Sequence, residues 1–253
     1  MAQEKYVAYV GTYTHENSIG IHVYDIDMEK GKLTERSVAP ISNPSNIAVA
    51  HSGKYLYSIE DEGVASFSID ENGDLTKINQ AWIGGMRACY VEIDSNDRYL
   101  FLAGFHDGKV TMMRLNEDGS IAGIADGVFH QGVGKSSVEK RMDPRVSCTK
   151  LTPDEKYLCA VDWGLNQIKI YEVDYEEGKL HLYDILRFPF NSAPRRIRFS
   201  KDGKFAYVLE ETTNMVDIYT YDLREGKPVF EKIKTTSVLE KEDSLASGSA
   251  LEF

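Results

Sequence analysis

The segment RIRFSKDGKFAYVLEETTNMVDIYTYDLREGKPVFEKI (196–233) decides the fold, because it divides into four short runs separated by turns. Apolar and polar residues alternate within the runs, and Val, Ile, Tyr and Phe fill many of the apolar positions, as is typical of β-strands. The turns contain Gly, Asp and Asn, which tolerate left-handed backbone conformations. A four-stranded antiparallel unit is therefore expected here.

The same pattern occurs three more times upstream, with first strands that start near residues 46, 90 and 148. Including the unit above, these starts are separated by 44, 58 and 48 residues. Repeats of this length are typical of β-propellers, in which each unit is a four-stranded blade. No stretch has apolar residues at helical spacing. The sequence predicts an all-β chain that forms a single β-propeller domain over residues 1–253.

The two ends of the chain differ from the repeat. The first unit, YVAYVGTYTHENSIGIHVYDIDMEKGKLTER (6–36), starts at a second strand, and SALEF (249–253) looks like a first strand. Five blade-like units and one strand leave a ring open, whereas propellers close the ring to remove sheet edges. We therefore expect a domain that is incomplete at its C-terminus and could self-associate through the unclosed blade edge. In the alternative, SALEF pairs with the first unit and closes a five-bladed ring.

Composition excludes several classes of function. The net charge of −11 argues against nucleic acid and anionic membranes as partners, and no apolar run is long enough to span a bilayer. Residues 135–204 carry 14 Lys and Arg against 11 Asp and Glu, a local excess that would suit a small anionic ligand. The three cysteines, at 89, 148 and 159, have no metal-like spacing and favour a reducing cytoplasm.

Ordered motifs along the chain resemble the seven-bladed propeller lactonases, whose best-known activity is that of 6-phosphogluconolactonase. The motifs are YVGTYT (9–14), GIHVYDID (20–27), NPSNIAV (43–49), LTPDEKYLCAVDWGLNQIKIY (151–171), APRRIRF (193–199), KFAYVLEE (204–211) and KTTSVL (234–239). Members of this family are longer by roughly two blades, which agrees with an incomplete domain and the same repeat. The resemblance implies a cleft near the propeller channel that hydrolyses a lactone without a cofactor.

The resemblance also implies which residues line that cleft. APRR (193–196) matches the family's Gly-Pro-Arg-His and keeps the arginine, Arg195, but lacks the histidine. PRVS (144–147) matches Pro-His-x-His and lacks both histidines, so that Arg145 stands in the place of the first. Glu211 aligns with the family's glutamate. Catalysis by the family's histidines is therefore not expected here, whereas the roles of its arginine and glutamate are retained.

Strand pairing gives an independent reason to group these residues. Antiparallel pairing of the first two strands of a blade places Arg195 and Arg196 beside Glu210 and Glu211. Lactone hydrolysis needs a donor for the developing oxyanion, a base for water and an anchor for substrate charge. We expect Glu211 and Arg195 to be catalytic. The predicted substrate-binding residues are Arg145, Arg196, His106 and Asp162.

Structural alternatives exist for each of these roles. Arg195 and Glu211 could form an ion pair at a blade rim, Asp162 could cap a turn, and His106 could be a solvated loop residue. For the whole chain, the favoured function is hydrolysis of 6-phosphogluconolactone, an anionic lactone, to 6-phosphogluconate. The alternatives are a non-catalytic propeller that binds a partner, and a muconate-type enzyme that forms a lactone.

Other motifs do not support further chemistry. FHQGVGKSS (129–137) lacks the first glycine of a phosphate-binding loop and is expected to be a lid-like loop between blades. The six histidines form no closely spaced pair, so no metal site is predicted. A Gly-x-Ser-x-Gly elbow is also absent, and a serine-triad esterase is not expected.

Overall fold

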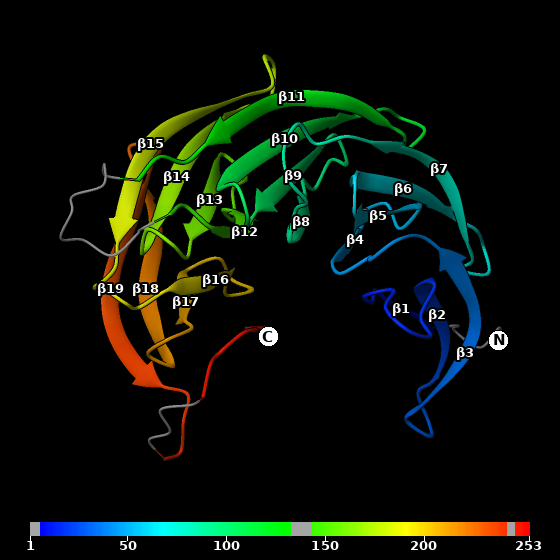
Figure 1. Ribbon diagram of the computed structural model, residues 1–253. Helices are drawn as coiled ribbons and strands as arrows, with labels where there is room; N and C mark the ends of the chain where they lie inside the picture. Colours follow the sequence, from blue (N-terminus) through cyan, green and yellow to red (C-terminus); the bar gives the residue numbers. More distant parts are fainter. Residues whose placement is uncertain (1–5, 133–142, 242–245) are drawn as a thin grey trace. The chain divides into compact units, whose positions relative to one another are not determined.

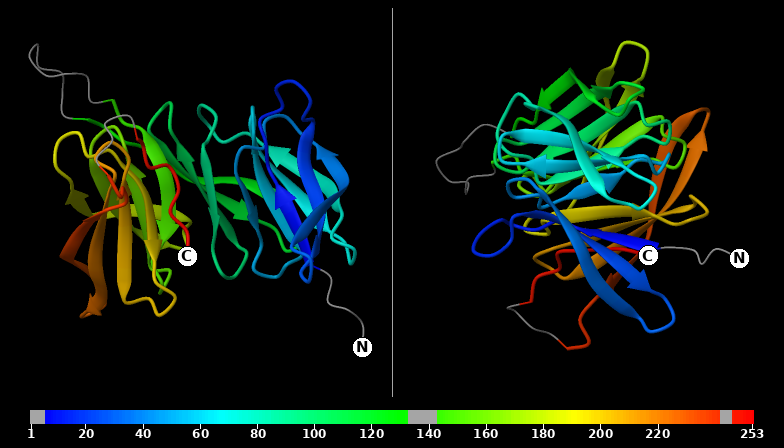
Figure 2. Two further views of the ribbon diagram at one scale, coloured as in Figure 1. Left: turned by 90° about the horizontal axis from the view of Figure 1, so that it is seen from below. Right: turned by 90° about the vertical axis from the view of Figure 1, so that its right-hand side faces the viewer.

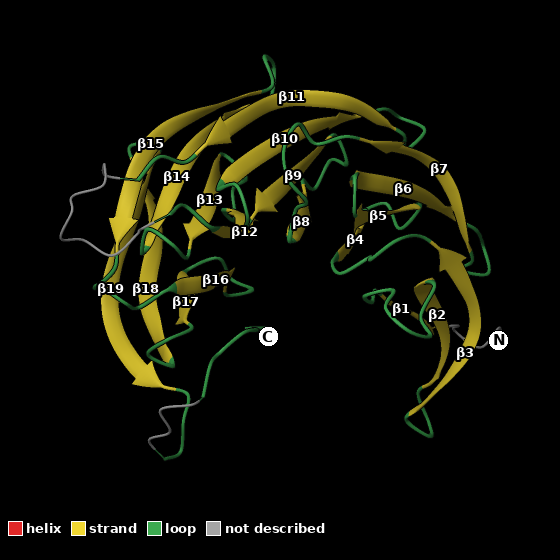
Figure 3. Ribbon diagram, in the orientation of Figure 1, coloured by secondary structure: helices red, strands yellow, loops and turns green. Residues whose placement is uncertain are grey.

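The computed structural model describes residues 6–132, 143–241 and 246–253, and all of the regular elements in these ranges are β-strands (Figure 3). The strands form five antiparallel sheets, labelled in Figure 1. No part of the described chain forms a helix with the length and apolar character needed to cross a membrane. The prediction of an all-β fold built from propeller blades is confirmed.

The chain divides into two compact units. Unit 1 comprises Met1–Leu100 and Met113–Ile124, and unit 2 comprises Phe101–Met112 and Ala125–Phe253. The division falls within the third sheet, whose strands in spatial order are β11 (Ile121–Phe129), β10 (Lys109–Leu115), β9 (Tyr99–Gly104) and β8 (Tyr90–Ile93). The prediction of a single domain over the whole chain stays a prediction.

Unit 1 contains the first two sheets. The first has the order β1 (Tyr6–Val10), β2 (Gly20–Asp27) and β3 (Lys32–Pro40), and the second has the order β4 (Ile47–Val49), β5 (Tyr55–Glu60), β6 (Gly63–Ile69) and β7 (Leu75–Ala81). Among the described residues the first sheet has three strands and starts at β1, as the sequence predicts. Apolar residues of these strands, together with Ile41 directly after β3, form a common core that includes Ile21, Leu56, Ala65 and Phe67.

Unit 2 contains the fourth and fifth sheets. They follow sequence order, as β12 (Val146–Leu151), β13 (Tyr157–Asp162), β14 (Gln167–Asp174) and β15 (Lys179–Arg187), and then β16 (Pro194–Phe199), β17 (Phe205–Glu210), β18 (Met215–Arg224) and β19 (Lys227–Ser237). Strand β16 packs against β12 and β13. Because β13 is buried at every position, it forms the centre of this part of the core.

Two β-bulges interrupt the first strands of the fourth and fifth sheets. In β12 the register shifts between Val146 and Cys148, and in β16 it shifts between Pro194 and Arg196. Each bulge leaves one extra residue, Ser147 or Arg195, outside the regular pairing, which re-aims its side chain. The two bulges contact each other, since the Ser147 hydroxyl donates to the Arg195 carbonyl oxygen at 2.9 Å.

Residues 246–253 run beside the fifth sheet without forming a strand (Figure 2). Glu252 pairs with Arg198 of β16 at 2.5 Å, and the Phe253 ring packs edge-on against Tyr207 of β17. SALEF is therefore docked on a blade of unit 2. The prediction that it forms a strand differs from the structure, in which side chains rather than a strand ladder hold it.

Candidate functional site

The predicted contact between Arg195 and Glu211 is present in unit 2. Pro194 is paired with Glu210, so that the start of β16 lies beside the end of β17, as antiparallel pairing predicts. The Arg195 guanidinium Nη1 lies 2.6 Å from Glu211 Oε2, and about a fifth to a third of each side chain remains exposed, 29% for Arg195 and 21% for Glu211. The ion pair is therefore mostly buried, but both side chains keep enough exposed surface to contact a small molecule.

Two further groups determine what each oxygen of Glu211 can do. The indole nitrogen of Trp163 donates to Oε2 at 2.8 Å, so this oxygen accepts hydrogen bonds from both Trp163 and Arg195. Within the described parts of the chain, Oε1 accepts only from the exposed Ser247 hydroxyl, at 3.2 Å. Because Oε2 is fixed by two strong donors, Oε1 is the oxygen better placed to accept a hydrogen bond from a ligand or water.

Arg145 lies beside this pair and is held by aromatic rings. Its guanidinium carbon is 5.3 Å from the centre of the Phe105 ring and 5.8 Å from that of Trp163. Cation–π contacts of this kind orient a guanidinium without neutralising it. Among the described residues the Arg145 guanidinium has no ion pair and no hydrogen bond. We call Arg145, Trp163, Arg195 and Glu211 the Glu211 cluster.

A buried pair anchors the backbone of Arg145. The Asp162 carboxylate has no exposed surface and accepts hydrogen bonds from the backbone N–H groups of Arg145, at 2.9 Å, and Leu165, at 3.0 Å. Its second oxygen accepts from His130 Nδ1 at 2.7 Å, and His130 Nε2 is buried without a partner in the described part of the chain. Burial lowers the pKa of His130, although Asp162 opposes this shift, and the imidazole is therefore neutral near pH 7.

Glu210, the neighbour of Glu211, points to the other side of the strand and is buried. The Thr213 hydroxyl donates to it at 2.5 Å. Burial raises the pKa of Glu210, and the nearby Asp217 adds to the rise. The two adjacent glutamates thus differ in environment, and only Glu211 faces the cluster.

The remaining predicted site residues have other surroundings. The Arg196 guanidinium donates to the backbone oxygens of Ser147 and Arg195 and so helps to fix the two bulges. His106 is exposed and lies edge-on against Phe105. The Asp162 carboxylate accepts hydrogen bonds from backbone N–H groups, as expected if it caps a turn. Direct contact of these three residues with a substrate stays a prediction.

Sequence reasoning missed Trp163, Phe105, His130 and Ser247. Trp163 lies within the quoted stretch VDWGLNQ, but its contact with Glu211 spans 48 residues and depends on how neighbouring blades pack. A tryptophan directly after a strand that ends in aspartate was the only available signal. The predicted lid-like loop falls partly outside the described residues, at 133–137.

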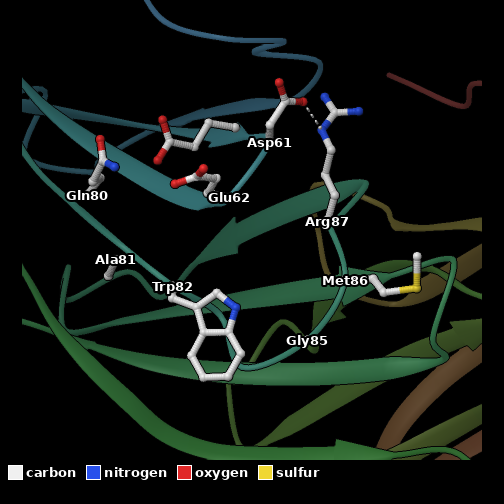
Figure 4. Close-up of a pocket in the computed structure, with 9 residues that line it drawn as sticks. Asp61, Glu62, Gln80, Ala81, Trp82, Gly85, Met86 and Arg87 are labelled. Atoms are coloured by element: carbon white, nitrogen blue, oxygen red, sulfur yellow. Dashed lines mark ion pairs between the residues drawn. The ribbon is translucent and has the colours of Figure 1, made fainter.

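A separate hollow of about 770 Å³ lies in unit 1 and was not predicted. In Figure 4, Asp61, Glu62 and Gln80 lie on one side of it and the exposed Trp82 on the other. Its complete lining is Glu60, Asp61, Glu62, Gln80, Ala81, Trp82, Gly85, Met86 and Arg87. The one arginine is already paired with Asp61 at 3.6 Å, so three carboxylates make this hollow unfavourable for an anion.

Metal chemistry has no support in the described residues, because no group of three His, Cys, Asp or Glu side chains gathers there in an arrangement that could hold an ion. The chemistry of the Glu211 cluster is that of two arginines and one carboxylate. Such a set can bind an anion, polarise a carbonyl group and orient a water molecule.

Comparison with known proteins gives one family. A family model described as "Lactonase, 7-bladed beta-propeller" matches residues 7–251. The 6-phosphogluconolactonase of Bacillus subtilis is 34% identical over 241 residues, which cover 93% of this chain and 67% of that protein. An uncharacterized protein of Staphylococcus saprophyticus is 32% identical, with 85% and 63% covered. The chain thus spans about two thirds of the length of these relatives.

Solved structures agree with this match. The periplasmic gluconolactonase of Pseudomonas aeruginosa has a TM-score of 0.83 and 28% identity, covering 93% of this chain and 68% of that one. A protein from Lactobacillus plantarum has the same TM-score and 27% identity, covering 95% and 69%.

Proposed function

Because the chain belongs to the seven-bladed β-propeller lactonase family, we propose that it hydrolyses a sugar lactone, with 6-phosphogluconolactone as substrate and 6-phosphogluconate as product. The observation that carries this proposal is the Glu211 cluster, in which a partly exposed carboxylate gathers with one ion-paired arginine and one arginine that has no ion pair among the described residues. The similarity to the Bacillus subtilis 6-phosphogluconolactonase supports the choice of substrate.

Each residue of the cluster has a role in this proposal. Arg195 polarises the lactone carbonyl and stabilises the oxyanion that forms on it. Glu211 Oε1 accepts a proton from the attacking water or orients it, while Trp163 and Arg195 hold Oε2 in place. Arg145, which has no counter-ion among the described side chains, binds the phosphate.

The bonds that change are those of an ester hydrolysis. Water adds to the lactone carbonyl, the bond between that carbon and the ring oxygen breaks, and the ring oxygen leaves as a hydroxyl group. The product acid ionises near neutral pH, and one proton is released for each lactone opened. Proton release is therefore a direct measure of turnover.

The test is proton release from 6-phosphogluconolactone above its spontaneous hydrolysis, with the Bacillus subtilis relative as positive control. We expect Glu211→Gln to lose at least about 100-fold in kcat, the usual contribution of a general base. Glu225→Gln, in an exposed turn, is the matched control. Turnover by wild type that is unchanged in Glu211→Gln would contradict the assigned role, and no turnover by the folded wild-type chain would contradict the function.

A second substrate tests whether Arg145 binds the phosphate. With gluconolactone, which has no phosphate, Arg145→Leu should leave kcat/KM unchanged, whereas with 6-phosphogluconolactone KM should rise by about 10-fold or more, as expected for the loss of a charge-assisted contact. An equal loss on both lactones would instead mean that Arg145 does not bind the phosphate.

One observation favours a second candidate, a non-catalytic binding module. Glu211 Oε2 is already engaged by two donors at 2.6 and 2.8 Å, as in a structural ion pair. This candidate predicts a thermal shift with 6-phosphogluconate and no turnover by a folded chain.

We also propose a cytoplasmic location, because the three cysteines are free and fit a reducing compartment. Cell fractionation would test it.

A further inference from the structure

Unit 1 contains a serine, a histidine and a glutamate in series, on the first blade. The Ser18 hydroxyl lies 2.9 Å from His22 Nε2, and His22 Nδ1 lies 2.8 Å from Glu35 Oε2. His22 belongs to β2 and Glu35 to the paired strand β3, while Ser18 is in the loop that enters β2. We call these three residues the Ser18 relay.

The hydrogens along the relay can be assigned from its neighbours. The hydrogen bond from His22 lowers the pKa of Glu35, which is therefore ionised and accepts the Nδ1 hydrogen. Nε2 then carries the lone pair, and the Ser18 hydroxyl donates to it. Tyr24 also donates to Glu35 Oε2, at 3.2 Å, and fixes the carboxylate. In this arrangement His22 is placed to remove the hydroxyl proton of Ser18.

The loop around Ser18 has further features of a nucleophile site. With its hydrogen directed to His22, Ser18 Oγ accepts from the Thr12 hydroxyl, which lies 2.5 Å away and whose other acceptor is the Gly20 carbonyl oxygen at 3.1 Å. Within the described residues, the backbone N–H groups of Ser18 and Ile19 have no acceptor, so they are available to an oxyanion. Two exposed apolar side chains belong to the same loop, Ile19 directly after Ser18 at 60% exposure and Tyr13 directly after Thr12 at 58%. They offer an apolar contact for an acyl group.

We propose that Ser18 is a nucleophile activated by His22 and Glu35, forming a second reactive site that accepts carboxylic esters with a good leaving group. The Ser18 proton moves to His22 Nε2 as Oγ bonds to the acyl carbon. The bond to the leaving group then breaks, and that group takes the proton from His22. Water, activated by the same imidazole, hydrolyses the acyl-serine and restores the site.

This site is independent of the proposed lactone chemistry. It uses no residue of the Glu211 cluster, and it lies within one unit, on residues whose contacts are all local to the first blade. No Gly-x-Ser-x-Gly elbow is involved, which is why the sequence did not predict it. Triads are defined by geometry and role rather than by sequence order.

The test is covalent labelling with an alkyl fluorophosphonate, which reacts with activated serines by losing fluoride. The intact full chain should gain the mass of one phosphonyl group, and peptide mapping should place it on Ser18. We expect Ser18→Ala to abolish labelling. His22→Gln should slow it by about 100-fold or more, the contribution of a general base, and Glu35→Gln should slow it by a smaller factor.

Ser37→Ala is the matched control, because Ser37 lies on β3 but donates to Asp74, at 2.7 Å, rather than to a histidine. This variant should label at the wild-type rate. Circular dichroism and unchanged lactone turnover show that each variant is folded. Absence of an adduct on folded wild type would overturn the proposal, as would labelling of Ser18 at an undiminished rate in folded His22→Gln. Release of p-nitrophenol from p-nitrophenyl acetate, lost in Ser18→Ala, would support it.

Discussion

Replacement of Asp162 by alanine should be among the most destabilising single changes in unit 2. The carboxylate is fully buried and accepts hydrogen bonds from His130, at 2.7 Å, and from the backbone of Arg145 and Leu165, at 2.9 and 3.0 Å. Asp162→Ala removes both acceptor oxygens and so all three hydrogen bonds at once. The consequence reaches the candidate site, because Arg145 is held by one of these bonds.

The cost can be worked out bond by bond. A buried group left without a partner costs about 1–3 kcal/mol. His130 is almost wholly buried and loses its partner in full, whereas Arg145 and Leu165 are half-buried, and water can replace part of their loss. Summing one full and two partial losses gives about 3–5 kcal/mol, the range found when a buried pair is broken.

Asp162→Asn provides the comparison that isolates the cause. The asparagine oxygen can still accept from the two backbone N–H groups. Its amide can donate to His130 Nδ1 if the ring proton moves to Nε2, which has no partner among the described residues. We therefore expect a loss of only about 1 kcal/mol, the net worth of one hydrogen bond.

The assay is urea unfolding followed by Trp163 fluorescence. The chain has two tryptophans, and the exposed Trp82 can be replaced by phenylalanine so that only Trp163, next to Asp162, reports. If the dependence of the free energy of unfolding on urea concentration is unchanged, the shift of the urea midpoint gives the change in the free energy of unfolding. Asp222→Ala, at an exposed carboxylate, should change stability by less than about 0.5 kcal/mol. A loss below about 1 kcal/mol for Asp162→Ala, or equal losses for alanine and asparagine, would refute the reasoning.

Three further predictions concern the same blades. Trp163→Phe removes the indole hydrogen bond to Glu211 and should lower kcat/KM for the lactone by about 10-fold, equal to about 1.4 kcal/mol; an unchanged kcat/KM would contradict it. Burial lowers the pKa of His130 in the folded state, so the unfolded state binds the proton more readily. The free energy of unfolding should therefore be highest above the unfolded pKa of about 6.5 and decrease as the pH drops below it. Urea unfolding at each pH measures this, and His130→Gln should show a shallower decrease. Burial raises the pKa of Glu210, which favours the neutral form; Glu210→Gln should therefore raise Tm at pH 7, and the gain should disappear near pH 4, whereas a lower Tm at pH 7 would count against it.

Much of the fold was predictable because its signals are local. Alternation and turn residues define strands of three to eleven residues, and the 44–58-residue repeat groups them into blades. The contact between Arg195 and Glu211 was also predictable, since it follows from pairing two strands joined by one tight turn. The bulge that aims Arg195 was not, because no residue type in β16 marks it.

The rest of the candidate site depends on packing between blades. Trp163 reaches Glu211 from the preceding blade, and His130 reaches Asp162 from a loop 32 residues away. Such contacts depend on the rotation of one sheet against the next, which a repeat length does not specify. The Ser18 relay was not predicted for a different reason: its three residues lie within an 18-residue stretch and share one blade, but no Gly-x-Ser-x-Gly elbow marks the serine.

The paired charges of APRR and LEE serve different purposes within each pair. Arg195 bulges out of β16 toward Glu211, while Arg196 turns back to the carbonyl of Ser147. Glu211 is partly exposed and held by two donors, while Glu210 is buried with a raised pKa. Successive residues of a strand face opposite sides, so adjacent like charges need not repel or cooperate. One member of each pair stabilises the blade, and the other remains partly exposed in the Glu211 cluster.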